Sequence, residues 1–197
     1  MDEQKKPVSI FLCGVGGQGI IKLGDVIAEV AFRAGFDVKK NEIHGLSQRG
    51  GSVTSHVKFG PKVHSPVIME GGADFVVALE ELEALRKAHF SHVNGRILVN
   101  RQHILPASCV SGGREYPGDI AARLAGFATV EYVDAFETAR SSGDVRMTNM
   151  GMAGALSTFL EFEESLWEKV IRAMVPAASA DNNMNVFKDC RAQLTGA

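Results

Sequence analysis

The feature that most constrains the fold of this chain is a strand, a glycine turn and a helix in immediate succession. The apolar run Val8–Cys13 is rich in β-forming residues and has the length of one buried strand. Gly14-Val15-Gly16-Gly17-Gln18-Gly19 follows it, and Ile20–Ala31 then carries apolar residues at helical spacing. A second strand near residues 36–40 completes a β–α–β unit, which predicts an α/β fold whose sheet begins parallel.

The rest of the chain returns to this alternation after one interruption. Ser52–Phe59 alternates with period two, as a half-exposed strand does, and with residues 63–68 it predicts an inserted β-hairpin. Further strands are predicted at Phe75–Leu79, Arg96–Asn100 and Thr129–Val133, with helices between and after them. We therefore expect a Rossmann-like open, mostly parallel sheet with flanking helices, in a single domain over residues 1–197. The polar residues from about 177 predict a tail that docks on a partner or frays.

Charge and cysteine content exclude several classes of protein. With 21 Lys and Arg against 23 Asp and Glu, the net charge of −2 gives no basic face for duplex nucleic acid. The apolar run at the start is too short to span a bilayer and no signal peptide is visible, so we expect a cytoplasmic protein that does not contact membranes. Three scattered cysteines exclude a CxxC metal knuckle, a ferredoxin-type cluster and a local disulfide scaffold, and no metal site is predicted.

The glycine turn is the first candidate binding site. Its glycines permit a tight turn, close approach of a bound group and packing of helix on strand, while N–H groups at the helix start favour a phosphate. A dinucleotide site also needs an acidic residue at the end of the second strand, yet Asp37 lies at its start and Glu42 beyond its end. Three interpretations stay open: an NAD(P)-linked reductase, a nucleotide-binding module without catalysis, and glycines that only permit packing. The candidate cofactor-binding residues are Gly14, Gly16, Gly17, Gln18 and Gly19.

The second candidate site is the loop Ser47-Gln48-Arg49-Gly50-Gly51. Arginine presents a planar fork that suits phosphate or carboxylate, and two adjacent glycines expose backbone N–H groups to an anion. The alternative is a solvated turn whose arginine pairs with a nearby acid. His44 and His56 flank the loop without a third ligand at suitable spacing, so we interpret both as structural.

Other reactive side chains are better explained by packing. Cys13 ends an apolar strand and is predicted to be a buried, inert thiol. Glu80 follows the predicted strand Phe75–Leu79, near the edge where α/β sheets bind ligands, but we interpret it as negative charge in the first turn of a helix. Gly118-Asp119-Ile120 lacks the final glycine of the thiamine-diphosphate signature, and no nucleophile elbow, Walker loop or HExxH helix is present. No catalytic residue is therefore assigned to this chain.

The two glycine motifs together resemble a known family. Gly14–Ile20 joined to Glu42–Val53 is similar to the gamma domain of the 2-oxoacid:ferredoxin (acceptor) oxidoreductases, in particular the group that acts on indolepyruvate. The similarity continues through nearly the whole chain, in Ser55–Gly60, Ser65–Ile68, Ala73–Asp74, Glu80-x-x-Glu83-Ala84-x-Arg86, Val175–Pro176 and Asn183-x-Asn185-x-Phe187.

The resemblance implies a division of labour between two chains of a hetero-oligomer. A large partner subunit would hold thiamine diphosphate, magnesium and iron–sulfur clusters. The complex would oxidatively decarboxylate arylpyruvates such as indolepyruvate with coenzyme A, which gives an acyl-CoA, CO₂ and reduced ferredoxin. This chain would hold none of the redox cofactors, would be inactive alone, and would complete the site with its two loops. Whether the loops contact coenzyme A, thiamine diphosphate or only the partner stays open.

Overall fold

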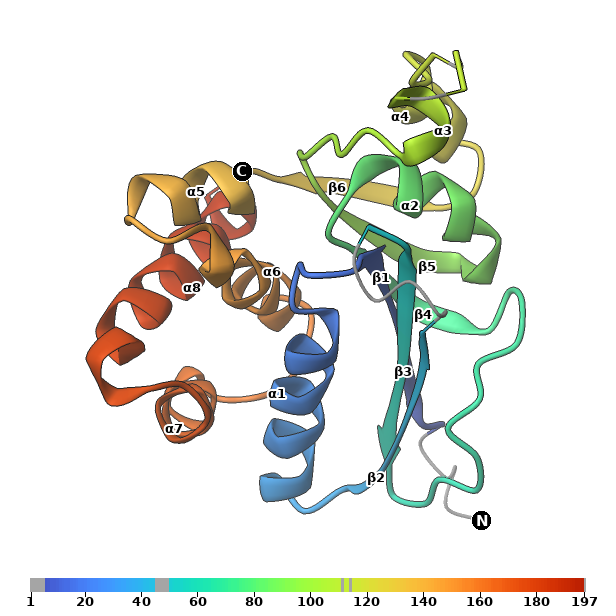
Figure 1. The fold of residues 1–197 in the computed structure, drawn as a ribbon. Coiled ribbons are helices and arrows are strands. Elements are labelled where there is room, and N and C mark those ends of the chain that lie inside the picture. Colours follow the sequence, from blue (N-terminus) through green and yellow to red (C-terminus); the bar gives the residue numbers. More distant parts are fainter. Residues whose placement is uncertain (1–5, 45–49, 111, 114, 197) are drawn as a thin grey trace.

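A six-stranded sheet forms the centre of the molecule, with helices on both of its faces (Figure 1). The computed structural model describes residues 6–44, 50–110, 112–113 and 115–196. The strands, in chain order, are β1 Val8–Val15, β2 Asp37–His44, β3 Ser52–Gly60, β4 Ala73–Ala78, β5 Ser91–Asn100 and β6 Thr129–Val133. Their order across the sheet is β2-β3-β1-β4-β5-β6.

The strand directions confirm the expected α/β fold with a mostly parallel sheet. β1, β4, β5 and β6 run parallel to one another, and β3 runs antiparallel to both of its neighbours, β2 and β1. The inserted hairpin is formed by β2 and β3, so the expectation that residues 63–68 pair with β3 was wrong. The β–α–β unit at the start is real, but its two strands are not neighbours. Hydrophobic spacing along a segment reports which face is buried, not which strand lies beside it.

β3 is more buried than its alternating sequence predicted. Thr54 and His56 are polar yet no more than 7% exposed, because both faces of the strand are covered. The helix α1 (Ile20–Arg33) packs on one face, and residues 61–72, which form no strand, contact the other through Ile68. The Ile68 N–H donates to His56 Nδ1 (3.0 Å), and the ring of Phe11 lies 4.7 Å from that of His56. Residues 61–72 thus help to bury β3 and also supply a hydrogen-bond donor to His56.

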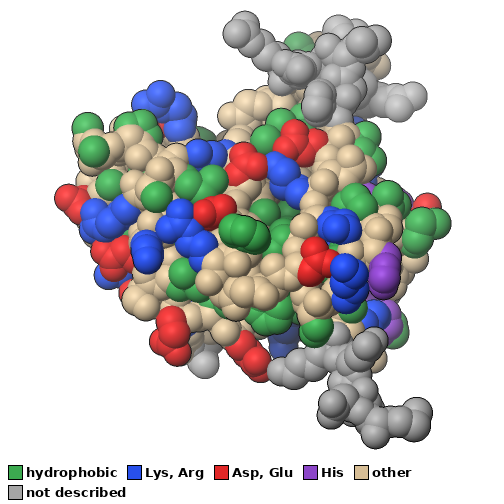
Figure 2. Space-filling view, turned by 90° about the horizontal axis from the view of Figure 1, so that it is seen from below, with side chains coloured by type: hydrophobic (Ala, Val, Ile, Leu, Met, Phe, Trp, Pro, Cys, Tyr) green, Lys and Arg blue, Asp and Glu red, His purple; other side chains and the backbone are tan. Residues whose placement is uncertain are grey.

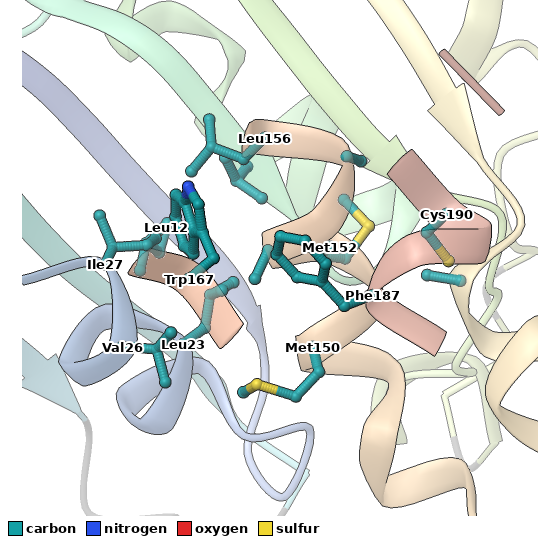
Figure 3. Packing of buried hydrophobic residues seen from close by; sticks show 14 of the residues in the cluster. Leu12, Leu23, Val26, Ile27, Met150, Met152, Leu156, Trp167, Phe187 and Cys190 are labelled. Carbon is teal, nitrogen blue, oxygen red and sulfur yellow. The ribbon is translucent and has the colours of Figure 1, made fainter. Parts of the chain in front are cut away.

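The helices divide between the two faces of the sheet. One face packs against α1, α6, α7 and α8, and the other against α2 and α4. In the first layer, the rings of Trp167 and Phe187 lie 5.7 Å apart and are fully buried against Leu12 and Leu23 (Figure 3). The helices are α1 Ile20–Arg33, α2 Glu81–Lys87, α3 Ala107–Val110, α4 Ile120–Leu124, α5 Ala135–Ser141, α6 Thr148–Ser157, α7 Glu164–Met174 and α8 Ala180–Thr195.

The C-terminal segment forms the helix α8 (Ala180–Thr195), which packs on α6, so the expectation that it frays was wrong. An added Cβ at Gly154 of α6 would lie 2.8 Å from the carbonyl carbon of Phe187, so the two helices touch through their backbones. Met184, Val186 and Phe187 are buried although most of their neighbours are polar. A few apolar residues on one face are enough to bury a helix when a glycine lets its partner approach closely.

The surface at the lower edge of the sheet mixes charges of both signs. Figure 2 shows this edge, which lies opposite the glycine turn, with Lys and Arg side chains interspersed among Asp and Glu. The described residues visible on this face form no continuous basic patch of the kind that binds nucleic acid. None of the helices in the described part of the chain is both long and apolar enough to cross a membrane.

Candidate functional site

The first glycine turn connects β1 to α1, as the sequence predicted. Gly17 and Gly19 have φ of 103° and 81°, in the left-handed region that favours glycine. An added Cβ at Gly14 would lie 2.7 Å from Gln18 Oε1, and one at Gly19 would overlap the side chain of Asn149. At Gly17 an added Cβ would meet nothing within 4 Å, and the residue is exposed. Gly14 and Gly19 therefore serve the packing of the chain itself, and Gly17 leaves backbone open to a partner or ligand.

The end of the second predicted loop lies directly beside the first. The Gly16 N–H donates to the carbonyl oxygen of Gly51 at 2.8 Å. Gly50 is exposed, with a φ of 76° and open space around it. Ser47, Gln48 and Arg49 lie outside the described residues. Two motifs separated by more than 30 positions thus meet at the upper edge of the sheet, where β1 ends and α1 begins (Figure 1).

The side chain of Gln18 occupies the crevice beside the turn. β1 is followed by a helix on one face of the sheet and β4 by a helix on the other, and such a switch point is where open α/β sheets bind ligands. Gln18 Oε1 accepts from the Val15 N–H at 2.7 Å. Its Nε2 donates to the Leu79 carbonyl and to Gln102 Oε1, both at 2.8 Å. The Gln18 side chain therefore links the end of β1 to the residue that follows β4.

Two further amide side chains extend this network. Asn100 is fully buried at the end of β5, and its Nδ2 donates to the Leu79 carbonyl at 3.0 Å. Its Oδ1 accepts from the Phe136 N–H at 3.0 Å, so it also holds the start of α5. Gln102 accepts from both Gln18 and Asn100. Asn100 and Gln102 belong to no motif, and their place just after a predicted strand was the one signal that could have found them.

Glu80 has a structural role at the start of α2, as its position in the sequence predicted. Its Oε2 accepts from the Glu83 N–H at 2.8 Å and caps α2, and the residue is 1% exposed. Its Oε1 accepts from the Tyr116 hydroxyl at 2.5 Å and from the Ile104 N–H at 3.1 Å. Burial, followed by this bond to Glu80, raises the pKa of Tyr116 above its usual range. A buried carboxylate with three donors is not positioned to act as an acid or base on a ligand.

The thiol and the histidine near the turn are also structural. Cys13 is fully buried as predicted, and burial raises the pKa of its thiol. His56 accepts a hydrogen bond as expected, while the side chain of His44 lies outside the described residues. Among the residues that the structure describes, no three His, Cys, Asp or Glu side chains come together as a metal site would require. The described residues therefore do not fit a metal ion or an iron–sulfur cluster.

Two small pockets lie near the first glycine turn: the first is lined by Gly17 and Gln18, and the second by Lys22 and Asn149, beside the start of α1. One has a volume of about 160 Å³, the other about 230 Å³, and both are lined in part by Arg146. Pockets that hold a whole ligand usually measure about 300–1,000 Å³, so neither encloses a nucleotide by itself. Arg146 is exposed and pairs with Asp144 at 2.6 Å. The first pocket is lined by Gly17, Gln18, Gln102, Phe136, Val145, Arg146 and Thr148, which suit binding better than acid–base chemistry.

The geometry argues against a dinucleotide site at this turn. β3 lies between β1 and β2, which moves the acidic residues of β2 about 10 Å sideways, two strand spacings from the turn. Asp37 accepts from the Val63 N–H at 2.9 Å, a bond that lowers the pKa of its carboxyl group. Glu42 lies 2.5 Å from Lys40 Nζ. Neither carboxylate is therefore available to a ribose bound at the glycine turn.

Comparison with known proteins identifies the family. Residues 9–193 match the model of the family described as pyruvate ferredoxin/flavodoxin oxidoreductase. The chain is 38% identical over 186 residues to the indolepyruvate oxidoreductase subunit IorB of Archaeoglobus fulgidus, covering 92% of each chain. It is 34% identical over 195 residues to the subunit of that name from Thermococcus kodakarensis, covering 93% of this chain and 94% of the relative.

Solved structures share the fold. The pyruvate oxidoreductase subunit PORC of Thermotoga maritima superposes with a TM-score of 0.74 at 22% identity, over 95% of this chain and 96% of that one. A 2-oxoglutarate:ferredoxin oxidoreductase chain of Magnetococcus marinus, solved with 2-oxoglutarate, coenzyme A and succinyl-CoA bound, superposes at 0.77 and 20% identity. That superposition covers 98% of this chain and 32% of the longer one. By sequence match and by fold, the chain belongs to the pyruvate ferredoxin/flavodoxin oxidoreductase family.

Proposed function

We propose that this chain is a subunit of a thiamine-diphosphate-dependent 2-oxoacid:ferredoxin oxidoreductase that acts on aryl-2-oxoacids such as indolepyruvate. Four relatives at 34–38% identity carry the name indolepyruvate oxidoreductase subunit, and each match covers at least 92% of this chain. A relative named as a 2-oxoglutarate synthase subunit is more distant, at 26%. This ranking supports an aryl rather than a short dicarboxylic substrate.

The proposed reaction requires groups for which the described residues of this chain form no binding site. The carboxylate of a 2-oxoacid and the coenzyme A thiol yield an acyl-CoA, CO₂ and one proton, and two electrons pass to two ferredoxins. Bound thiamine diphosphate supplies the carbon nucleophile for the oxoacid, and iron–sulfur clusters conduct the electrons. The described residues lack a metal-binding cluster, and Cys13 and Cys190 are fully buried. We therefore assign these groups, with magnesium, to a large partner subunit.

The role that we propose for this chain is to supply an edge of the coenzyme A and partner-binding surface. The observation that carries this proposal is the Gly16–Gly51 hydrogen bond, which joins two glycine motifs beside the open backbone of Gly17 and Gly50. Close approach to an anionic or planar group requires backbone without side chains. The small pockets beside the turn need a second surface to enclose a ligand. The residues that we propose make contact are Gly16, Gly17, Ser47, Gln48, Arg49, Gly50 and Gly51. Of the other candidates, Gly14 and Gly19 permit the packing of the turn, and Gln18 holds it through internal hydrogen bonds.

Co-expression with the candidate large subunit tests the proposal. The purified complex should reduce ferredoxin, or a viologen dye, in a reaction that requires both an arylpyruvate and coenzyme A. The chain alone should show neither this activity nor tight binding of NAD(H) or NADP(H). Failure of the two chains to co-purify, or micromolar binding of NAD(H) by this chain alone, would overturn it.

A further inference from the structure

A buried carboxylate outside both glycine motifs lies against the point where they meet. Glu83 belongs to α2, and its side chain is 2% exposed. Its Oε2 accepts from the Ser52 hydroxyl at 2.6 Å, and its Oε1 accepts from Arg86 at 2.6 Å. The Cys13 thiol packs on its backbone carbonyl at 3.7 Å. Each carboxylate oxygen of Glu83 thus has a donor, and one of these donors comes from the start of β3.

Ser52 connects this carboxylate to the glycine edge. It is the first residue of β3 and follows Gly51, whose carbonyl oxygen accepts from the Gly16 N–H. A chain of contacts therefore runs from α2 through Glu83 and Ser52 to Gly51, and from there to the first turn. An added Cβ at Gly50 would meet nothing within 4 Å, so no side chain packs on that side of the backbone and the Gly51 and Ser52 hydrogen bonds are the contacts that hold this segment. Hydrogen bonds to a charged acceptor are roughly twice as strong as neutral ones.

We propose that Glu83 is a positioning residue for the proposed coenzyme A and partner edge, acting through the Ser52 hydroxyl on the Gly50–Gly51 backbone. The inference rests on the proposed function for what the edge binds, but not for the anchoring itself. Glu83 touches no ligand in this scheme. It holds α2 and the start of β3 at a fixed spacing, so that Gly51 keeps its bond to Gly16.

Ser52→Ala is the sharpest test, because it removes one exposed oxygen and leaves the Glu83–Arg86 pair intact. In the full chain, hydrogen exchange at the Gly16 amide should quicken by about three- to tenfold, as loss of about one net hydrogen bond implies. Ser52→Thr keeps the hydroxyl and should restore the wild-type rate. Ser65→Ala is the matched control, since Ser65 is also exposed and accepts from the Val67 N–H at 3.2 Å, within another loop. Unchanged exchange at Gly16 in Ser52→Ala would refute the anchoring.

Kinetics of the assembled complex test the functional part separately. Ser52→Ala should raise the KM for coenzyme A by about three- to tenfold with kcat within twofold, which corresponds to a loss of binding rather than of chemistry. Ser52→Thr should reverse the change. Glu83→Gln should have the same signature, and a normal melting curve will exclude simple misfolding. If exchange responds but KM does not, Glu83 is only structural and the positioning role is wrong. If the wild-type complex needs no coenzyme A, the proposed function fails while the exchange result stands.

Discussion

Replacing Gln18 by leucine tests whether its amide holds the carboxyl edge of the sheet together. Leucine has a similar volume but cannot hydrogen-bond, so the change removes the three contacts at 2.7, 2.8 and 2.8 Å and leaves packing nearly intact. Of the three partners, Leu79 and Gln102 keep the bonds that Asn100 donates to them. The Val15 N–H loses the acceptor that Gln18 supplied.

The expected loss of stability follows from these partners. An N–H left without an acceptor costs about 1–3 kcal/mol, and two weakened bonds whose acceptors retain another donor add about 1 kcal/mol together. We therefore expect Gln18→Leu to lower the free energy of unfolding by about 2–4 kcal/mol, a large share of the 5–15 kcal/mol typical of a domain.

Urea unfolding of the isolated chain, followed by circular dichroism, measures this change. Gln193→Leu is the matched control, because Gln193 also makes three hydrogen bonds but is exposed on α8. Its loss should cost under about 1 kcal/mol, since water replaces the lost partners. If Gln18→Leu costs no more than Gln193→Leu, the amide does not hold the strand ends together and our reading of the crevice is wrong.

Three further predictions concern packing, pH and the second loop. Gly154→Ala should lower the melting temperature by several degrees, because the new methyl group would overlap the Phe187 backbone and force α6 and α8 apart. Stability should fall as pH drops below about 6.5: burial lowers the pKa of His56 in the folded chain, so the unfolded chain takes up the proton first. Arg49→Ala should raise the coenzyme A requirement of the assembled complex, measured as KM in the dye assay, or impair its assembly.

Each of these predictions has a control that separates it from a general effect. Gly118→Ala adds a methyl group where nothing lies within 4 Å, and it should leave the melting temperature unchanged. His56→Gln should remove the part of the pH slope that comes from this ring; an identical slope would contradict the assignment. Arg172→Ala removes an exposed arginine on α7, so kinetics equal to those of Arg49→Ala would argue against a specific role for the loop.

Local patterns predicted the start of the chain well. The strand, turn and helix at Val8–Arg33 depend on residues within a few positions of one another, and the structure places them as expected. Local patterns did not predict which strands lie side by side in the sheet. The insertion of β3 between β1 and β2 pairs residues that are not adjacent in sequence, and residues 61–72 contact β3 through the bond to His56. The burial of α8 depends on a glycine in α6, which no pattern within α8 reveals.

In the candidate site, too, local sequence predicted some features and only the tertiary structure showed others. Glycines at fixed spacing next to an apolar strand need only local backbone geometry, so the sequence by itself identified the first turn and the end of the second loop. The contacts that define the edge are long-range: Gly16 with Gly51, Gln18 with Leu79, and Ser52 with Glu83. A hydrogen bond between distant residues forms when the sheet brings strand ends together, and a linear sequence does not record that proximity. Tertiary structure alone therefore decided that the described end of the second motif lies against the first turn, and which side chains hold the two together.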